Sequence, residues 1–229
     1  MVIYEISFSS PLENLVFDEL LLDEAEAGRG GDVLRLWESP TPFIVLGRTG
    51  KPAHEIYTTR CGRDHVPVLR RCSGGGTVIQ GPGCMNFSFI LSRVRCPALN
   101  DLHRSYQEIL NPIIRMLAGL GVSAVFRPIS DLALADFDRK FSGNAQRRKR
   151  EYVLHHGTIL YDFDLSLIST YLRQPRDVPA YRKGRRHHDF VANIPVIRIK
   201  RGVAPEKQEP GTSNGGEKAY SKRKSGQPG

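Results

Sequence analysis

Hydrophobic residues alternate with polar ones at the start of the chain and predict a β-strand over residues 2–8. A helix is predicted directly after it, because Ser10 can cap a helix, Pro11 suits the first turn, and Glu13 completes a capping box. This helix should end near Gly28. Its apolar residues recur at helical spacing and form one face: Leu12, Leu15, Val16 and Leu20.

Short apolar runs separated by turn residues predict most of the remaining elements. The predicted strands are residues 33–37, 43–46, 66–71, 86–91, 123–126, 132–137 and 152–163. Asn100 or Asp101 should cap a second helix running to Leu120, which Pro112 should kink or split. A third, short helix should follow Asp164. The order shows no regular βαβ alternation, so we expect an α+β domain around a central, largely antiparallel or mixed sheet flanked by helices.

The composition changes near residue 200 and suggests two parts. Residues 201–229 are rich in Gly, Pro, Ser, Lys and Glu and have almost no bulky apolar residue. Such a segment cannot offset its ordering entropy by burial. We therefore expect one catalytic-type domain over residues 1–200 and a polar, disordered tail over residues 201–229.

The charge and the cysteines narrow the functional classes. A formal net charge of +9 over 229 residues indicates an acidic partner such as a nucleotide, a nucleic acid or an acidic protein face. The start of the chain resembles no signal peptide, and no apolar stretch has the length of a membrane span. The four cysteines contain no CxxC pair, so no metal site is expected. We expect a cytoplasmic protein.

A glycine-rich stretch between Arg70 and Leu91 is the first candidate site. Gly74, Gly75 and Gly76 follow Arg71 and Ser73 directly. Three consecutive glycines are costly inside a packed element, but they let backbone N–H groups approach a ligand. Two adjacent arginines suggest that this ligand is anionic. The alternative is a flexible hairpin loop between two strands.

A second candidate stretch runs from Ser130 to Thr158. Lys140 is expected just after a strand, and it is followed by small, turn-forming residues up to Ala145. The basic run 147–150 is typical of a solvated face or of a docking surface. His155 and His156 are adjacent, so in a strand they would point to opposite faces, which disfavours a two-histidine metal site.

These stretches together resemble the lipoate–protein ligase catalytic domain. The resemblance rests on three ordered motifs: RRCSGGGTV, DRKFSGNAQ and HHGTILYDFDL. It extends to NLVFDELLL, LRLWESP and YRKGRRHHDFVANIPV, and so covers roughly residues 1–200. The family shares its fold, a class II synthetase-like catalytic domain, with biotin ligases and octanoyltransferases. No P-loop or Rossmann fingerprint is present, so a nucleotide would have to be bound in this family's manner.

The resemblance implies a role for each matched residue. Arg71, Ser73, Gly74, Gly75, Gly76 and Thr77 would form the acyl- and adenylate-binding loop, and Lys140 would be the catalytic lysine. The nucleotide side would be lined by Ser142, Gly143, Asn144 and Ala145, with His156, Gly157 and Thr158 on the adjoining strand. Asp131 is a further candidate. The substrates would be ATP with Mg²⁺ and lipoate or octanoate. The acceptor would be a lysine of a lipoyl-domain protein, either the E2 of a 2-oxoacid dehydrogenase or a glycine-cleavage H-type protein.

The sequence departs from these ligases in two places. Cys84 stands where many members have an asparagine, and the polar tail stands where longer members carry a small C-terminal domain that assists adenylation. The chain would then need an accessory subunit, or would transfer an acyl group that is already activated. An octanoyltransferase or lipoyltransferase that uses acyl carrier protein is the first alternative, with Cys84 as its thiol. A non-catalytic binding protein is the second. Nucleic acid is disfavoured because no aromatic residues are interleaved with the basic runs.

Overall fold

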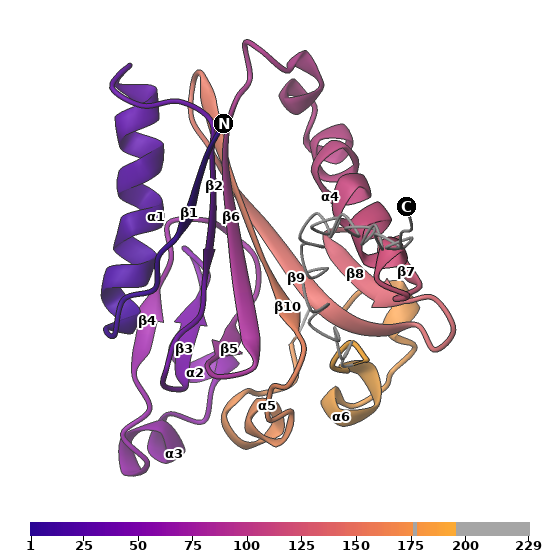
Figure 1. Cartoon of the computed structure of the whole chain (residues 1–229). Coiled ribbons are helices and arrows are strands. Elements are labelled where there is room, and N and C mark those ends of the chain that lie inside the picture. The colour runs from indigo at the N-terminus through magenta and orange to yellow at the C-terminus, as the bar shows by residue number, and fades with distance from the viewer. Residues whose placement is uncertain (176–177, 196–229) are drawn as a thin grey trace, which may run out of the picture. The chain divides into compact units, whose positions relative to one another are not determined.

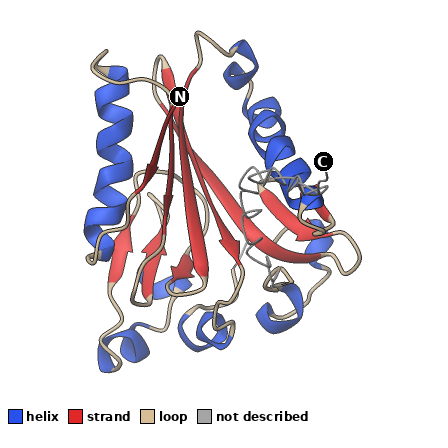
Figure 2. Ribbon diagram, viewed as in Figure 1, coloured by secondary structure: helices blue, strands red, loops and turns tan. Residues whose placement is uncertain are grey.

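The computed structural model describes residues 1–175 and 178–195 and contains two β-sheets with helices around them (Figure 1, Figure 2). The larger sheet has seven strands. In spatial order they are β1 (Val2–Glu5), β2 (Val33–Trp37), β6 (Cys84–Ser92), β10 (Tyr152–Leu160), β9 (Arg139–Arg148), β8 (Asp131–Leu134) and β7 (Ala124–Arg127). The smaller sheet has the order β4 (Val68–Arg70), β3 (Phe43–Leu46), β5 (Val78–Gln80).

The pairing makes the larger sheet mixed but mostly antiparallel. Only β1 and β2 pair in parallel, whereas β2–β6, β6–β10, β10–β9, β9–β8 and β8–β7 are antiparallel. The α-helices are α1 (Pro11–Glu26), α2 (Pro52–Glu55), α3 (Thr58–Arg63), α4 (Leu102–Gly119), α5 (Ser166–Tyr171) and α6 (His187–Phe190). The α+β class predicted from the sequence is confirmed.

Helices and the smaller sheet cover the two faces of the larger sheet (Figure 1). On one face α4 packs through Tyr106 and Leu110 against Phe87, Phe141 and neighbouring apolar residues. On the other face α1 packs on β6 and β10. The smaller sheet packs beside α1 on this same face, where a cluster from β2, β3 and their neighbours excludes water. We call these the α4 face and the α1 face.

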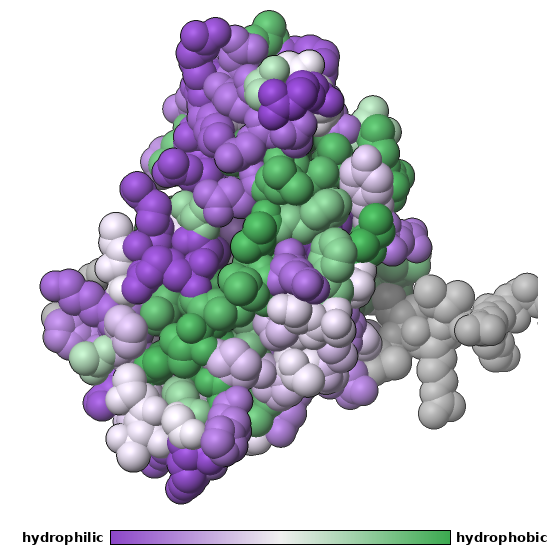
Figure 3. Space-filling view, turned by 90° about the vertical axis from the view of Figure 1, so that its left-hand side faces the viewer, coloured by the Kyte–Doolittle hydropathy of each residue, from purple (hydrophilic) through white to green (hydrophobic). Residues whose placement is uncertain are grey.

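Helix α1 begins as predicted but buries a different side. The Ser10 hydroxyl accepts a hydrogen bond from the Glu13 N–H, and Pro11 is the first helical residue. Three apolar residues expected on the packed face are about half exposed, namely Leu12, Val16 and Leu20. The buried residues are Asn14, Asp18, Leu22 and Ala25. Figure 3 shows the face of the molecule on which α1 lies, where a band of hydrophobic residues runs between hydrophilic areas.

The polar residues buried by α1 meet a buried arginine from the sheet. Arg35 of β2 is 0% exposed and forms an ion pair with Asp18 at 2.7 Å. Its guanidinium also donates to Asn14 and to the Ile6 carbonyl, and Asp18 in turn accepts a hydrogen bond from Ser88 at 2.5 Å. A buried charge of this kind is tolerated because every donor finds an acceptor. The polar residues on the inner face of α1 therefore fix its position on the sheet.

Several elements differ from those predicted. The largest difference is β9, because Lys140 was expected after a strand and residues 142–145 were described as turn-forming, whereas all of them lie in one ten-residue strand. The glycine-rich stretch contains the short strand β5, and α2 and α3 occupy a segment for which no element was predicted. Pro112 lies inside α4 without splitting it, and Asp101 caps that helix as expected. The predicted tail, residues 201–229, lies outside the described residues. In the part of the chain that the structure describes, no helix is both long and apolar enough to cross a membrane.

Candidate functional site

The glycine stretch forms a loop that Arg71 holds in place. The Arg71 guanidinium donates to the Gly74 carbonyl at 2.6 Å, to the Gly76 carbonyl at 2.8 Å and to the Ser73 hydroxyl at 3.0 Å. Burial lowers the pKa of Arg71 to about 10, yet it stays charged at neutral pH. Because its donors point at loop carbonyls, those carbonyls are turned toward the arginine and the arginine shapes the loop from within.

The loop is also locked against the segment that follows β3. A Cβ atom at Gly47 would lie 2.0 Å from the Gly75 carbonyl oxygen, so the two backbones touch. Gly75 itself has φ +87°, which favours glycine. Arg70 donates to the carbonyls of Gly47 and Gly50 from the other side. Arg70 and Arg71, which were both expected to attract an anion, thus both donate hydrogen bonds to backbone carbonyls.

Thr77, at the end of the loop, is held by a residue that the sequence analysis did not single out. Its hydroxyl donates to Glu55 of α2, and the same carboxylate accepts the Lys51 N–H at 2.8 Å. Glu55 lies 22 positions before Thr77, in a segment with no recognisable motif. The sequence therefore offered no feature by which to find it.

Ser73 connects the glycine loop to strand β10. Ser73 is 1% exposed, and its hydroxyl accepts a hydrogen bond from Arg71 and lies 2.6 Å from Nε2 of His156. Burial, with the charge of Arg71 adding to it, lowers the pKa of His156 to about 3. The imidazole is therefore neutral at physiological pH and can accept the serine hydrogen at Nε2. Arg71, Ser73 and His156 form one hydrogen-bonded chain on the α1 face.

A β-bulge in β9 decides which way Lys140 points. Leu132 pairs with Ser142 but the next residue, Ala133, pairs with Lys140, so Phe141 is an extra residue in β9. Phe141 is fully buried in the cluster under α4. The bulge shifts the alternation and puts Lys140 on the same face as Gly143, where a Cβ atom would lie 2.9 Å from Nζ. Strict alternation would have put Lys140 on the α4 face.

The Lys140 ammonium forms an ion pair with the carboxylate of Asp131, at 2.7 Å between Nζ and Oδ1. Lys140 keeps 28% of its side chain exposed, whereas Asp131 keeps 9%. Ala145, two positions after Gly143 in β9, lies 3.9 Å from the Cβ position of Gly75. The lysine, its carboxylate partner and the glycine loop therefore meet on one face of β9 and β10.

The other sequence-predicted residues divide between the two faces. Gly143, Ala145, His156 and Thr158 lie on the α1 face with the loop, as their pairing and contacts require. The remaining side chains lie on the α4 face. There the Asn144 amide donates to Ser142 and to the Ser130 carbonyl, while its oxygen lies 3.3 Å from Nε2 of His155.

Gly157 makes room for that network. A Cβ atom there would lie 1.9 Å from the Asn144 amide oxygen and 2.5 Å from the Phe87 ring. Ser142, Asn144 and Gly157 thus support the site from behind, and their side chains do not line it. His155 and His156 point to opposite faces, as strand alternation predicted.

Cys84 lies on the same face of the sheet, two positions before Asn86, which pairs with Thr158, but it packs in a cluster that contains neither the glycine loop nor Lys140. It is 0% exposed in a cluster with residues of the smaller sheet, α3 and α5. Burial raises its pKa to about 12, and the nearby charge of Glu38 adds to the shift. Cys72 is half-buried, and burial raises its pKa to about 11. Neither thiol is set up to ionise near neutral pH.

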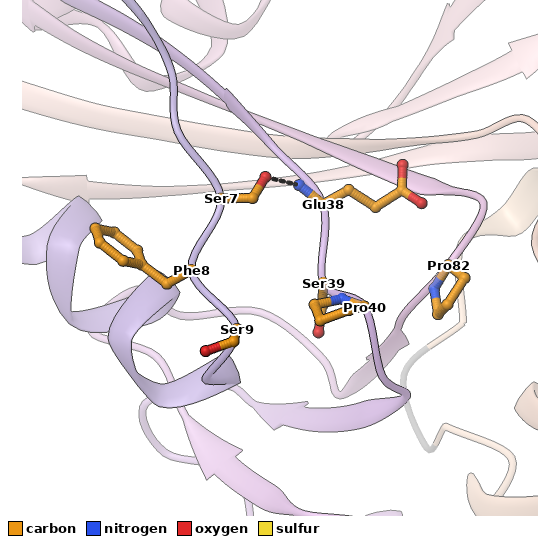
Figure 4. A pocket seen from close by; sticks show the side chains of 7 residues that line it. All are labelled: Ser7, Phe8, Ser9, Glu38, Ser39, Pro40 and Pro82. Atoms are coloured by element: carbon orange, nitrogen blue, oxygen red, sulfur yellow. Dashed lines mark hydrogen bonds between the residues drawn. The ribbon is translucent and has the colours of Figure 1, made fainter.

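Two open cavities lie near these elements. One, of about 300 Å³, lies between the segments Ser7–Ser9 and Glu38–Pro40, with Pro82 opposite (Figure 4). It contains none of the sequence-predicted site residues. The other, of about 320 Å³, is lined by Glu19, Arg48, Arg70, Arg71, Cys72 and Arg147. This arginine-rich cavity adjoins the glycine loop, and its charge suits an anionic group.

Among residues 1–175 and 178–195, no group of three or more His, Cys, Asp or Glu side chains converges. A Mg²⁺ ion that arrives with nucleotide phosphates needs only one or two carboxylates. The groups that could bind an anionic ligand at this site are therefore the side chains of Lys140 and Arg71 and the backbone of the glycine loop.

Comparisons with known proteins identify the family. Residues 10–202 match the family described as "Lipoyl protein ligase A/B catalytic domain". The chain is 32% identical over 162 residues to "Probable lipoate-protein ligase A" of Mycoplasma pneumoniae, which covers 71% of this chain and 46% of that relative. The chain thus spans about half the length of the curated relatives it matches.

Two solved structures share the fold. A lipoate-protein ligase A bound with ATP superposes with a TM-score of 0.68 at 22% identity, covering 84% of this chain and 75% of the other. P. falciparum LipL1 in complex with lipoate gives a TM-score of 0.62 at 22% identity, covering 77% of this chain and 52% of the other. Since the family match covers most of the sequence, the chain belongs to the lipoyl protein ligase A/B catalytic domain family.

Proposed function

We propose that this chain activates lipoate, or its analogue octanoate, with ATP and attaches the acyl group to a lysine of a lipoyl-domain protein. In the first step the carboxylate attacks the α-phosphorus of ATP, and pyrophosphate leaves. In the second step the acceptor lysine, as a neutral amine, attacks the acyl carbonyl, AMP leaves, and the amine loses a proton. No nucleophile from the chain itself is needed in either step.

The meeting of Lys140 and the glycine loop on one face carries this proposal. Both steps build up negative charge on oxygen atoms, and a fixed cation lowers the energy of that charge. Lys140 supplies the cation, held over the backbone of Gly143. The loop residues 73–77, Gly143, Ala145, His156 and Thr158 form the surrounding walls. A walled site also protects an acyl-adenylate from water.

The relatives and neighbours support the choice of substrates. One neighbour of the same fold is bound with ATP and another with lipoate. A third comes from a bi-partite archaeal lipoate protein ligase described with its E2 lipoyl domain. In our proposal Mg²⁺ enters with the ATP phosphates. An E2 or glycine-cleavage H-type lipoyl domain is the acceptor, and a separate accessory subunit assists adenylation, which the bi-partite archaeal ligase supports.

An acyl-transfer assay tests the proposal. The chain is incubated with ATP, Mg²⁺, lipoate and an apo lipoyl domain, with and without an accessory subunit, and the lipoyl domain is weighed by mass spectrometry. We expect an ATP-dependent mass gain of one lipoyl group. Lys140→Ala should lose about 2–4 kcal/mol of transition-state stabilisation, the usual loss for one oxyanion-stabilising group. Lys149→Ala is the matched control, because Lys149 follows the same strand but pairs with Asp23 on the surface. Near-normal transfer by a folded Lys140→Ala variant would contradict the assigned role.

The same assay separates the ligase from a thiol-dependent transferase. A transferase would hold the acyl group on a cysteine, and that requires a thiolate. Since the pKa of Cys84 is raised to about 12, we expect Cys84→Ser to keep most of the ATP-dependent activity. An acyl adduct on Cys84 with acyl carrier protein substrates, abolished in the serine variant, would favour the transferase instead.

A further inference from the structure

Tyr181 is joined to Lys140 through the carboxylate of Asp131. The Tyr181 hydroxyl donates to Oδ2 of Asp131 at 2.7 Å, and Oδ1 of the same carboxylate faces the Lys140 ammonium at 2.7 Å. Each oxygen atom of Asp131 therefore has its own partner. Tyr181 comes from a segment about 50 positions later in the chain, where it opens the stretch YRKGRRHHDFVANIPV, and the sequence analysis gave it no role.

The segment that carries Tyr181 is firmly held. The Tyr181 ring packs on Phe190 with centroids 5.1 Å apart, and the guanidinium of Arg185 lies 5.3 Å from the centre of the same Phe190 ring. Arg185 also donates to the Tyr181 carbonyl at 2.9 Å and to the Asp138 carbonyl at 2.9 Å. Phe190 is buried in a core cluster that includes strands of the smaller sheet. The Tyr181 hydroxyl is thus presented from a rigid base.

The same segment also holds the backbone of Lys140. The Ala192 N–H donates to the Lys140 carbonyl at 2.9 Å, and Val191 forms a β-bridge with Lys140. Arg139, one residue earlier, donates to the Val191 carbonyl at 2.7 Å. Residues 181–192 therefore contact Lys140 twice, once at its main chain and once, through Asp131, at its side chain.

We infer that Tyr181 is a positioning residue: by binding Oδ2 of Asp131 it orients Oδ1, and so fixes the Lys140 ammonium over Gly143. The inference rests on the proposed function for its catalytic consequence, but not for its geometry. A carboxylate can rotate about its terminal bond, and two partners on its two oxygen atoms remove that freedom. Burial and the neighbouring Asp131 raise the pKa of Tyr181, so its hydroxyl keeps the hydrogen that it donates.

The geometry can be tested without any enzymatic activity. The full chain, free of substrates, is labelled with a trace of acetic anhydride, and the labelling rate of each lysine is measured by mass spectrometry. We expect Lys140 to react about tenfold faster in Tyr181→Phe, since a hydrogen bond to a charged group corresponds to roughly that factor. Asp131→Asn should raise the rate at Lys140 to a similar extent. In the double variant Tyr181→Phe should add nothing, because it acts through Asp131.

Tyr161→Phe is the matched control. The Tyr161 hydroxyl likewise donates to a carboxylate, Glu38, at 2.8 Å, but Glu38 lines the separate cavity of Figure 4. This variant should leave labelling of Lys140 unchanged. Phenylalanine at 181 keeps the ring on Phe190, and thermal melting verifies folding. An unchanged Lys140 rate in Tyr181→Phe, or a double variant that labels faster than Asp131→Asn alone, would overturn the inference.

The transfer assay separates this inference from the proposed function. If both hold, Tyr181→Phe lowers kcat about tenfold and leaves the KM for lipoate unchanged, since the hydroxyl acts on the lysine and not on the acyl chain. If wild type transfers no acyl group while labelling changes as expected, the proposed function fails and the positioning role of Tyr181 stands.

Discussion

His155 shows how a buried environment fixes a protonation state. Its ring is 0% exposed, stacks with Phe87 at 6.2 Å and accepts a hydrogen bond at Nδ1 from the Gln146 amide. Nε2 then carries the hydrogen, which faces the Asn144 oxygen. A second proton would face the Gln146 amide hydrogens. Burial accordingly lowers the pKa of His155 to about 3.

We expect this histidine to make the protein less stable in mild acid. Its pKa is about 6.5 in the unfolded chain and about 3 in the folded protein, so below pH 6.5 only the unfolded state takes up the proton. The free energy of unfolding should fall by about 1.4 kcal/mol per pH unit per such histidine between about pH 6 and pH 4. Urea unfolding at a series of pH values measures this slope.

His155→Gln should reduce the slope by the contribution of one proton, leaving that of His156. His103→Gln is the matched control, because His103 is exposed on α4. If His155→Gln and wild type lose stability equally with acid, His155 does not titrate as described.

At the residue scale the sequence was enough to predict which residue types belong to the site, but not which other residues hold them in place. Lys140, Ser73 and the three glycines could be named because their types and order match a family pattern. No role could be given to Glu55, which lies outside the quoted motifs, or to Tyr181, which opens one of the quoted stretches. Each reaches the site through one side-chain hydrogen bond, across 22 and 50 positions respectively. A single long-range contact leaves no periodicity for a reader of the sequence to detect.

At the scale of elements, α1 gives a direct test of which face is packed. Leu22 is 0% exposed and Leu20 is 49% exposed, although both lie in the same helix. Leu22→Ala should lower the free energy of unfolding by about 2–5 kcal/mol, as expected for a buried leucine. Leu20→Ala should change it by less than about 0.5 kcal/mol. Equal losses in urea unfolding would show that the apolar stripe with Leu20 is packed after all.

The pattern of hydrophobic residues predicted the wrong buried face for α1 and no strand for β9, and the physical reasons are related. In α1 the buried Asn14 accepts a hydrogen bond from Arg35, and the buried Asp18 forms an ion pair with it. These interactions allow polar residues to occupy the core side of the helix. In β9 small and polar residues with low strand propensity are held by neighbours on both sides, β10 and β8. Pairing in the middle of a sheet overrides local preference. Both α4 and β10, whose own patterns agree with their packing, were predicted well.

For the whole molecule, charge is the property that the sequence gives directly. The chain carries a net charge of +9, and residues 201–229 contribute six Lys and Arg against three Glu. We expect deletion of residues 201–229 to leave the melting temperature unchanged, because the segment has almost no apolar content to bury. A drop of several degrees would contradict that expectation.

The same deletion should slow acyl transfer to an acidic lipoyl domain at low salt and have little effect at high salt. Long-range attraction raises encounter rates only when it is not screened. Transfer rates measured across a salt series, with kcat at saturating acceptor as the control, would test this. A rate loss that is independent of salt would indicate a different role for the segment.

The bulge at Phe141 has a consequence for how the gene can vary. Loss of the Phe141 codon would restore strict alternation in β9 and would still leave the lysine two positions before Gly143, on the α1 face. The pairing with β8 could be kept, and the loss would fall on the cluster under α4, where Phe141 is buried. Loss of one codon farther along the strand, such as that of Asn144, would instead turn the lysine to the face opposite Ala145. Natural variants should therefore tolerate a one-codon change in length at the bulge, at a cost in stability, but not elsewhere in this strand.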